Sequence, residues 1–162
     1  MTQKEIIDYL RLEQHIEGGY FSRTYASTET LSTNRNPPER NLLTCIYYLL
    51  TKESPIGYFH LNESDIHHFY QLGSPIRYFT ISPMGELETF ILGPDLKNNH
   101  YLQKCVKGGF WKSSILESGE FGLIGEAVAP GFHSSDAKLA TPESFKLLFP
   151  ELWPQIHHLI KF

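Results

Sequence analysis

Short runs of apolar and β-branched residues recur at nearly even intervals through the middle of the chain. These runs cover residues 56–61, 66–72, 76–81, 87–92, 101–106, 110–116 and 121–128. Turn sequences such as Ser82-Pro83-Met84-Gly85 and Gly93-Pro94-Asp95 separate them and supply the fixed φ of Pro or the positive φ of Gly where a chain reverses. Evenly spaced short strands with such turns predict an antiparallel β-sandwich or barrel.

Two further strands precede this series. Residues 20–25 follow a Gly-Gly pair and place alternate side chains on two faces, which is the pattern of a strand. Residues 42–50 form an apolar run rich in aromatic and β-branched side chains, which predicts a strand covered on both faces. The segment 31–41 between them is polar and contains Pro37-Pro38. Because proline disrupts helix and sheet pairing alike, we expect a surface loop there.

Helical patterns appear only at the two ends of the chain. The spacing of Thr2–Glu5 is that of a capping box, and it predicts a short amphipathic helix over residues 3–11 that lies on the body as a lid. Two apolar stripes at helical spacing predict short helices within 141–161. We therefore expect one all-β domain spanning 1–162, with its β core at about 15–133.

Composition and charge exclude several classes of protein. Of the 162 residues 41% are hydrophobic and 20% are charged, which is an ordinary globular balance. The formal net charge of −4 provides no basic field, so we expect no nucleic-acid partner. The longest apolar run is far shorter than the ~20 residues that a membrane helix needs, and the first residues do not form a secretory signal. We expect a cytoplasmic protein without a membrane partner.

Three histidines and two acids lie close together between residues 57 and 70. His60, His67 and His68 stand near Glu63 and Asp65, which is consistent with a metal site or an acid–base cluster. The alternative is that Glu63, Ser64 and Asp65 form a solvated hairpin turn and that His67 points outward. Because successive side chains of a strand alternate between its two faces, His67 and His68 cannot both face the interior. The sequence leaves open which of them does.

Three other side chains stand out in strand-like segments. Glu126 interrupts an apolar run, so it must either face water or be paired. An unpaired carboxylate buried there would have a raised pKa that suits a general acid or base. Trp111 follows a Gly-Gly turn and is either a wall of a ligand pocket or part of the core. Arg23 lies between two aromatic residues, where it either stacks on a ring or binds an anion.

Several motifs, in their order along the chain, resemble the cupin superfamily, in particular its small single-domain group known as cupin 5. The resemblance implies a double-stranded β-helix (a jelly-roll β-barrel) with short N-terminal and C-terminal helices, a homodimer, and a structural similarity to sugar-nucleotide epimerases. The motifs that carry it are Glu17–Tyr25, Ser54–His60, His68 with Gly73, Pro83-Met84-Gly85, Leu92-Gly93, Gly109 with Trp111, and Val128–Phe132.

The metal-binding pattern of cupins carries over poorly to this sequence. His60 matches the first histidine of the family pattern, but Asn62, Ile66 and Lys112 stand at the other three ligand positions. Because a catalytic metal normally needs about three protein ligands, we expect no metal cofactor. A divalent metal near His60 is the weaker alternative, and it requires His68 or Glu126 to turn inward beside it.

The resemblance implies a cavity that binds a small polar metabolite, such as one derived from a carbohydrate, with an isomerase or epimerase as its catalytic form. The alternatives are a non-catalytic small-molecule-binding cupin and, less favoured, a metal-dependent oxygenase or hydrolase. The epimerase form needs a base, an acid and a group that orients them. Candidate catalytic residues are His60, His68, Tyr70 and Glu126. Candidate ligand-binding residues are Arg23, Tyr58, Asn62, Trp111, Ser113 and Phe132.

Overall fold

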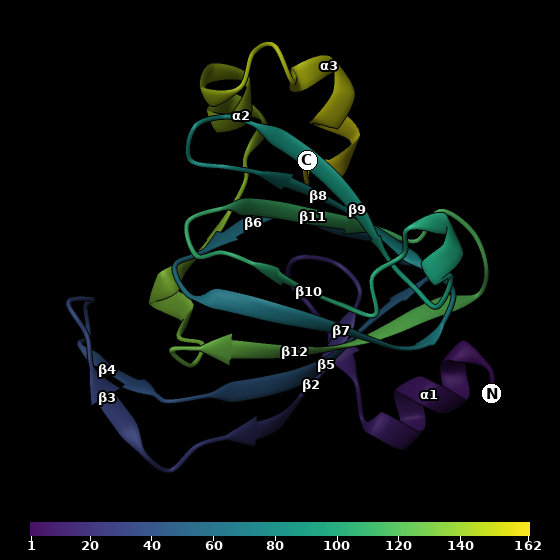
Figure 1. Ribbon diagram of the computed structural model, residues 1–162, viewed down its shortest axis with the longest axis horizontal. Helices are drawn as coiled ribbons and strands as arrows, with labels where there is room; N and C mark the ends of the chain where they lie inside the picture. The colour runs from purple at the N-terminus through teal and green to yellow at the C-terminus, as the bar shows by residue number, and fades with distance from the viewer.

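Two antiparallel β-sheets face each other in the computed structural model, which describes residues 1–162 (Figure 1). The six-stranded sheet has the order β1-β2-β5-β12-β7-β10, and the five-stranded sheet has the order β13-β6-β11-β8-β9. The first sheet contains β1 (Glu13–Gln14), β2 (Tyr20–Ala26), β5 (Thr44–Thr51), β12 (Phe121–Ala129), β7 (Asp65–Gly73) and β10 (Gln103–Val106). The second contains β13 (Ala137–Leu139), β6 (Ile56–Asn62), β11 (Trp111–Ile115), β8 (Ile76–Ile81) and β9 (Leu87–Leu92).

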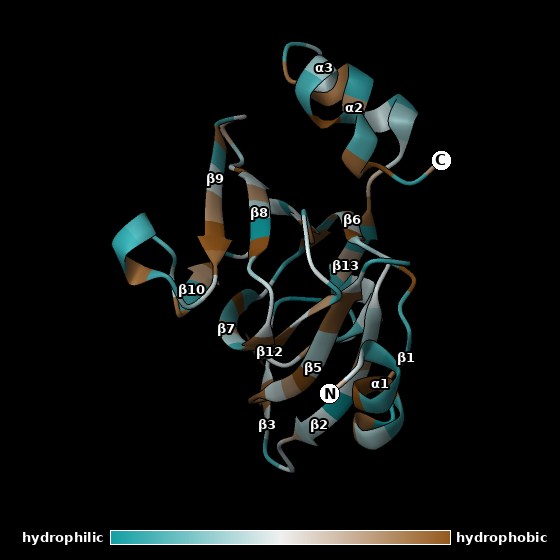
Figure 2. Ribbon diagram, turned by 90° about the vertical axis from the view of Figure 1, so that its right-hand side faces the viewer, coloured by the Kyte–Doolittle hydropathy of each residue, from teal (hydrophilic) through white to brown (hydrophobic).

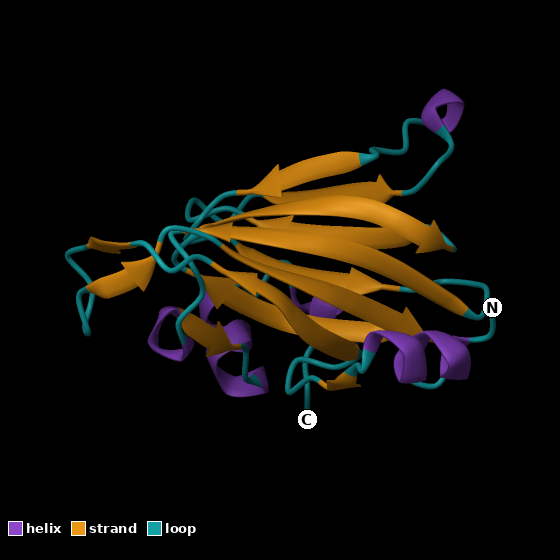
Figure 3. Cartoon of the chain, turned by 90° about the horizontal axis from the view of Figure 1, so that it is seen from below, coloured by secondary structure: helices purple, strands orange, loops and turns teal.

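Neighbouring strands in a sheet are mostly far apart in the sequence, which is the winding of a jelly roll. β12, for example, pairs with β5 on one side and β7 on the other. Seen from below, the strands lie in stacked layers with the helices outside them (Figure 3). Hydrogen-bonded strand pairs do not join the two sheets into a closed barrel. The predicted all-β jelly-roll fold is confirmed, in the form of a sandwich.

The core between the sheets is built from aromatic and aliphatic side chains on alternate strand positions. Tyr48 and Leu50 of β5 and Ile124 of β12 meet Ile76 and Tyr78 of β8, and all five are buried. Burial of this apolar area is the main favourable contribution to folding. Hydrophobic stretches run along β5 and β9, whereas the terminal helices have mixed faces (Figure 2).

The C-terminal helices cover the outer face of the five-stranded sheet. α2 (Pro142–Leu148), α3 (Trp153–Ile156) and the 3₁₀ helix η3 (His157–Leu159) form a second apolar cluster with β6 and β11. Phe145 is fully buried at its centre, with its ring 4.7 Å from that of Trp111 and nearly perpendicular to it. Trp111 is therefore a core residue beneath the helices.

The N-terminal helix covers the outer face of the other sheet. α1 (Gln3–Leu10) begins with the expected capping box and buries Ile6 against Leu49 and Leu123. Leu49 is adjacent in β5 to Tyr48, whose side chain lies between the sheets, so the two side chains point to opposite faces. The helix therefore lies on the body, as expected, but it does not cover the space between the sheets. None of the helices has the length and apolar character that crossing a bilayer requires.

The segment expected to be an unpaired loop is a small hairpin. β3 (Thr30–Ser32) pairs with β4 (Glu39–Asn41), and the two prolines lie in the turn, where they leave both strands free to pair. Arg40 is almost fully buried and binds the carboxylate of Asp136 through two nitrogens at 2.8 and 2.6 Å. This ion pair ties the hairpin to the short 3₁₀ helix η2 (Ser134–Asp136).

Candidate functional site

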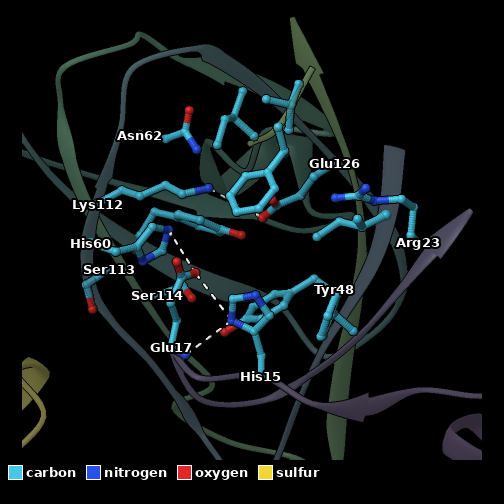
Figure 4. Close-up of a pocket in the computed structure, with 16 residues that line it drawn as sticks. His15, Glu17, Arg23, Tyr48, His60, Asn62, Lys112, Ser113, Ser114 and Glu126 are labelled. Atoms are coloured by element: carbon cyan, nitrogen blue, oxygen red, sulfur yellow. Dashed lines mark hydrogen bonds and ion pairs between the residues drawn. The ribbon is translucent and has the colours of Figure 1, made fainter. Parts of the chain in front are cut away.

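A cavity opens between the two sheets at the end where Arg23 and Phe132 lie (Figure 4). Its empty volume is about 670 Å³ when the part open to solvent is included. Apolar walls and a few converging polar groups are typical of small-molecule sites. The lining residues are His15, Glu17, Phe21, Arg23, Ile46, Tyr48, His60, Asn62, Ile66, Tyr78, Lys112, Ser113, Ser114, Glu126, Val128 and Phe132.

The first polar cluster joins the two sheets through Lys112. His68 and Glu126 are paired across β7 and β12, so their side chains share the inner face of the six-stranded sheet. Lys112 reaches them from β11, with Nζ 2.6 Å from His68 Nε2 and 3.5 Å from Glu126 Oε1. His68 Nδ1 faces the carbonyl of Lys104 at 3.4 Å and must donate to it. His68 Nε2 is then the acceptor for the ammonium of Lys112.

Glu126 is ionised in this arrangement. Burial raises the pKa of a carboxyl group, but the ammonium of Lys112 and the imidazole of His68 outweigh burial and hold the pKa of Glu126 well below its ordinary value. Of the alternatives that the sequence left open for Glu126, pairing holds, because the apolar strand brings the carboxylate against a cation from the opposite sheet. The raised pKa of an unpaired carboxylate does not apply. Lys112 and Glu126 form a buried ion pair, with side chains only 5% and 11% exposed.

The second polar cluster surrounds the carboxyl group of Glu17. Its Oε2 lies 3.3 Å from His60 Nε2 and 3.5 Å from His15 Nδ1. His60 donates its Nδ1 hydrogen to the carbonyl of Tyr58 at 2.8 Å, because a carbonyl only accepts. His15 Nδ1 accepts from the backbone N–H of Glu17 at 3.2 Å. The carboxyl group of Glu17 therefore faces two imidazole nitrogens that carry no hydrogen when the rings are neutral.

One proton shared among these three groups satisfies the contacts. Burial raises the pKa of Glu17, which favours the protonated acid. Burial, reinforced by the ammonium of Lys112, lowers the pKa of His60 to about 3. Burial also lowers the pKa of His15. The contacts are satisfied when Glu17 carries this proton beside two neutral imidazoles, and burial favours that form. The proton can move between Glu17 and either ring.

Two tyrosines on the cavity wall differ in their hydrogen bonding. The hydroxyl of Tyr48 donates to the carbonyl of Gly18 at 2.9 Å, which fixes the loop that carries Glu17. The hydroxyl of Tyr78 is buried and has no hydrogen-bond partner. Arg23 at the mouth lies over the ring of Phe132, with Cζ 5.9 Å from the ring centre, and both residues line the cavity.

Six of the ten residues predicted from the sequence line the cavity. These are Arg23, His60, Asn62, Ser113, Glu126 and Phe132. Two of them also make bonds within the fold, since Asn62 Oδ1 accepts from the backbone of Ser64 and Ser113 donates to the carbonyl of Gly57. His68 is fully buried behind Lys112, so it is the histidine of the pair that faces inward.

The other three predicted residues lie outside the cavity. Trp111 packs under the C-terminal helices, on the opposite face of its strand from Lys112. The hydroxyl of Tyr70 donates to the carbonyl of Gly73, near the far end of β7. Tyr58 contributes its backbone carbonyl to His60, but its side chain does not line the cavity. A direct contact between these three side chains and a ligand in the cavity is therefore not supported.

Ten further residues line the cavity without having been predicted as site residues. The polar ones are His15, Glu17, Tyr48, Tyr78, Lys112 and Ser114. The Gly18-Gly19 pair that follows Glu17 was a local signal in the sequence. Both glycines have positive φ, at 93° and 69°. A side chain at Gly18 would collide with the backbone carbonyl of Ile56, so only glycine lets this loop pass close to β6. This tight passage places Glu17 beside His60.

Lys112 occupies the place that a metal ion would need beside His68 and Glu126. The donors of His68 and Glu126 are 3.4 Å apart, which is close enough for both to bind one cation. The ammonium of Lys112 already contacts both of them. No group of three or more His, Cys, Asp or Glu side chains is arranged to hold a metal. The cation in this part of the cavity is the lysine itself.

The fold is a jelly-roll sandwich, and a polar cavity lies between its two sheets. Residues from both sheets line this cavity, which is the arrangement of a cupin-like protein. The chain matches the family described as Cupin superfamily (DUF985) over residues 4–140, and it belongs to that family. The resemblance seen in the sequence motifs is thereby confirmed.

Relatives with known sequences or structures cover most or all of the chain. Uncharacterized protein YML079W of Saccharomyces cerevisiae is 40% identical over 146 residues, which are 82% of this chain and 72% of the yeast protein. A hypothetical protein from Leishmania major has a TM-score of 0.93 at 25% identity and covers 100% of both chains. Protein SO0799 from Shewanella oneidensis has a TM-score of 0.91 at 30% identity, over 99% of this chain and 98% of its own.

An enzyme of known activity shares only the fold. Oxalate decarboxylase from Bacillus subtilis has a TM-score of 0.55 at 15% identity, over 90% of this chain and 36% of that chain. A likeness at this level of identity concerns the backbone architecture. Function must be argued from the cavity of the present chain.

Proposed function

We propose that this protein binds a small polar carbonyl compound between its sheets and isomerises it by moving a proton between neighbouring carbon atoms. The observation that carries this proposal is the contact of Glu17 with His60 and His15. A carboxylic acid and a neutral imidazole 3.3 Å apart, both lining one cavity, are an acid and a base ready at the same place.

The proton transfer can be written with every proton accounted for. Nε2 of His60 takes a proton from the carbon next to the carbonyl, and the electron pair of the broken C–H bond moves toward the carbonyl oxygen. Glu17 gives its proton to that oxygen, so the intermediate is a neutral enediol. The resulting carboxylate lies beside the new imidazolium, which raises the basicity of His60 as the step proceeds. The substrate carries a hydroxyl on the carbon that loses its proton. His60 returns a proton to the former carbonyl carbon, and Glu17 takes the proton of that neighbouring hydroxyl. The carbonyl group has then moved by one carbon, and both side chains are back in their starting states.

The surroundings of the pair support this role. The bond from His60 Nδ1 to the carbonyl of Tyr58 fixes the ring orientation, so Nε2 is the basic atom. The side chains of His60 and Glu17 are only 12% and 15% exposed, and low exposure strengthens their interaction. His15 offers an alternative acceptor for the proton of Glu17, which frees His60 to act as the base.

Hydrogen exchange tests the proposal directly. The purified protein is incubated in D₂O with a panel of small aldoses, ketoses and keto acids, and loss of the proton signal next to the carbonyl is followed by NMR. We expect exchange in at least one compound, slowed in Glu17→Gln by roughly 10²- to 10⁴-fold, the usual contribution of a general acid or base.

A surface glutamate provides the matched control. Glu53→Gln makes the same chemical change at an exposed position outside the cavity and should leave the exchange rate unchanged. Absence of exchange throughout the panel, or full activity of Glu17→Gln, would refute isomerisation. A compound that binds but is always recovered unexchanged would instead favour a non-catalytic binding protein.

Homodimer formation and a cytoplasmic location complete the proposal. The family resemblance is the support for the homodimer, and light scattering on the purified protein measures it. Fractionation of cells that produce the protein tests the location.

A further inference from the structure

The ammonium group of Lys112 has one hydrogen-bonding position left unused. Of its three N–H donors, one is directed to His68 Nε2 and one to Glu126 Oε1. No other protein acceptor lies within hydrogen-bond distance of Nζ. The side chain lines the cavity, and its contacts with two strands of the opposite sheet, β7 and β12, hold it in place. The third donor is available to an acceptor inside the cavity.

Tyr78 provides a second donor without a partner. The residue is 2% exposed and lines the same cavity, yet its hydroxyl makes no hydrogen bond. The ring is fixed by stacking on Phe90 at 5.0 Å and by an edge contact with His68 at 5.1 Å. A buried polar group without a partner costs free energy, so its retention on the wall of a cavity indicates that something else supplies the acceptor.

The charges lining the cavity do not sum to zero. Lys112 and Glu126 neutralise each other, and the shared proton leaves the cluster of Glu17, His15 and His60 neutral. Arg23 makes no ion pair and no hydrogen bond within the protein, and its guanidinium stands at the mouth. The cavity therefore carries one unbalanced positive charge.

We propose that the ligand of this cavity is a small carboxylate, with its oxygen atoms accepting from Lys112 and Tyr78 and its negative charge balancing Arg23. The inference rests on the proposed function only in taking the cavity as the ligand site, and it is independent of proton transfer there. For isomerisation it narrows the substrate class to carbonyl compounds that carry a carboxylate.

Binding of pyruvate, compared with hydroxyacetone, tests the class of ligand. The two compounds are similar in size, and both have a carbonyl group, but only pyruvate is charged. Isothermal titration should show that pyruvate binds the unmodified protein at least tenfold more tightly than hydroxyacetone does. Equal binding of the two, no binding of pyruvate, glyoxylate or glycolate, or tighter binding of inorganic phosphate than of these carboxylates would overturn the inference.

Tyr78→Phe tests the subsite, because it removes only the hydroxyl. We expect it to weaken pyruvate binding about tenfold and to raise the melting temperature of the ligand-free protein, since the unpartnered polar group is gone. A purely structural tyrosine would not change the two measurements in opposite directions. Unchanged pyruvate affinity in a folded Tyr78→Phe protein would overturn the assignment of the subsite.

Two controls complete the experiment. Tyr47→Phe makes the same change in β5 outside the cavity and should leave the affinity unchanged. Arg23→Gln should weaken pyruvate binding but not that of hydroxyacetone. Tight pyruvate binding without any hydrogen exchange would support this inference while refuting isomerisation. Hydrogen exchange on uncharged carbonyl compounds alone would support isomerisation and refute the carboxylate ligand.

Discussion

Removal of the Lys112 side-chain charge should destabilise the protein strongly at neutral pH. Lys112→Met keeps the length of the side chain but leaves the carboxylate of Glu126 buried without a cation, since its own side chain is 11% exposed. Breaking a buried ion pair in this way costs about 3–5 kcal/mol. The carboxylate can limit the cost by taking up a proton. Protonation at pH 7 of a carboxyl group with the ordinary pKa of 4.5 spans 2.5 pH units. The free-energy cost of that protonation is about 3.4 kcal/mol, at about 1.36 kcal/mol per unit.

The pKa of Glu126 also determines how the stability of each protein changes with pH. In the unmodified protein the pKa of Glu126 is lowered on folding, so its contribution is fully present above about pH 4.5 and is lost only below that. In Lys112→Met the pKa should rise above 4.5, so the folded state binds more protons than the unfolded state and gains stability as the pH falls. The difference between the two proteins should shrink from about 3 kcal/mol at pH 7 to about 1 kcal/mol at pH 5.

Urea unfolding at pH 7 and pH 5 measures this difference. The double variant Lys112→Met/Glu126→Gln removes the orphaned charge and should recover most of the lost stability at pH 7, with little change between the two pH values. Lys97→Met, on an exposed 3₁₀ turn, controls for the loss of a lysine. A destabilisation of Lys112→Met below about 1 kcal/mol at pH 7, or one that is the same at both pH values, would show that the pair is not buried and coupled as described.

Three further predictions concern other parts of the molecule. Gly18→Ala should lower the melting temperature much more than Gly85→Ala, because both glycines have positive φ but only the first faces a backbone carbonyl; equal decreases would contradict the close passage. Phe145→Ala should cost about 3–5 kcal/mol in chemical unfolding and leave pyruvate affinity unchanged. A change in affinity would mean that the helices and the cavity are coupled. ¹⁵N NMR at pH 6 should show His60 as a neutral ring protonated at Nδ1, since its pKa is about 3; an imidazolium pattern would refute the assignment.

The strands were predictable because their signals are local. The five from β5 to β9 lie within two residues of the expected ranges at each end, since turn residues mark where each one stops. The hairpin at 30–41 was not predicted, and the ion pair that ties it to the body joins Arg40 to Asp136, which is 96 residues away. Distant partners of this kind leave no trace in a local pattern.

Residues of the candidate site could be predicted only where the sequence of a single strand marked them as unusual. His60 and Glu126 stood out as polar residues in apolar strands, and both line the cavity. The state of Glu126 depends on Lys112, which comes from the opposite sheet, so its lowered pKa could not be read from β12 alone. Glu17 precedes a Gly-Gly pair that looked like a strand boundary, and its role appears only once the loop is seen to pass beside β6.

Lys112 stabilises the fold without adding net charge to the cavity. A bound metal ion can be lost or exchanged, and it requires deprotonated ligands. The lysine is part of the chain, and its ammonium is already neutralised by Glu126 within the protein. The pair therefore adds no net charge, and Arg23 at the mouth is left to set the sign of the ligand. This separation explains why Lys112→Met is expected to unfold the protein more readily, whereas Arg23→Gln is expected to change what it binds.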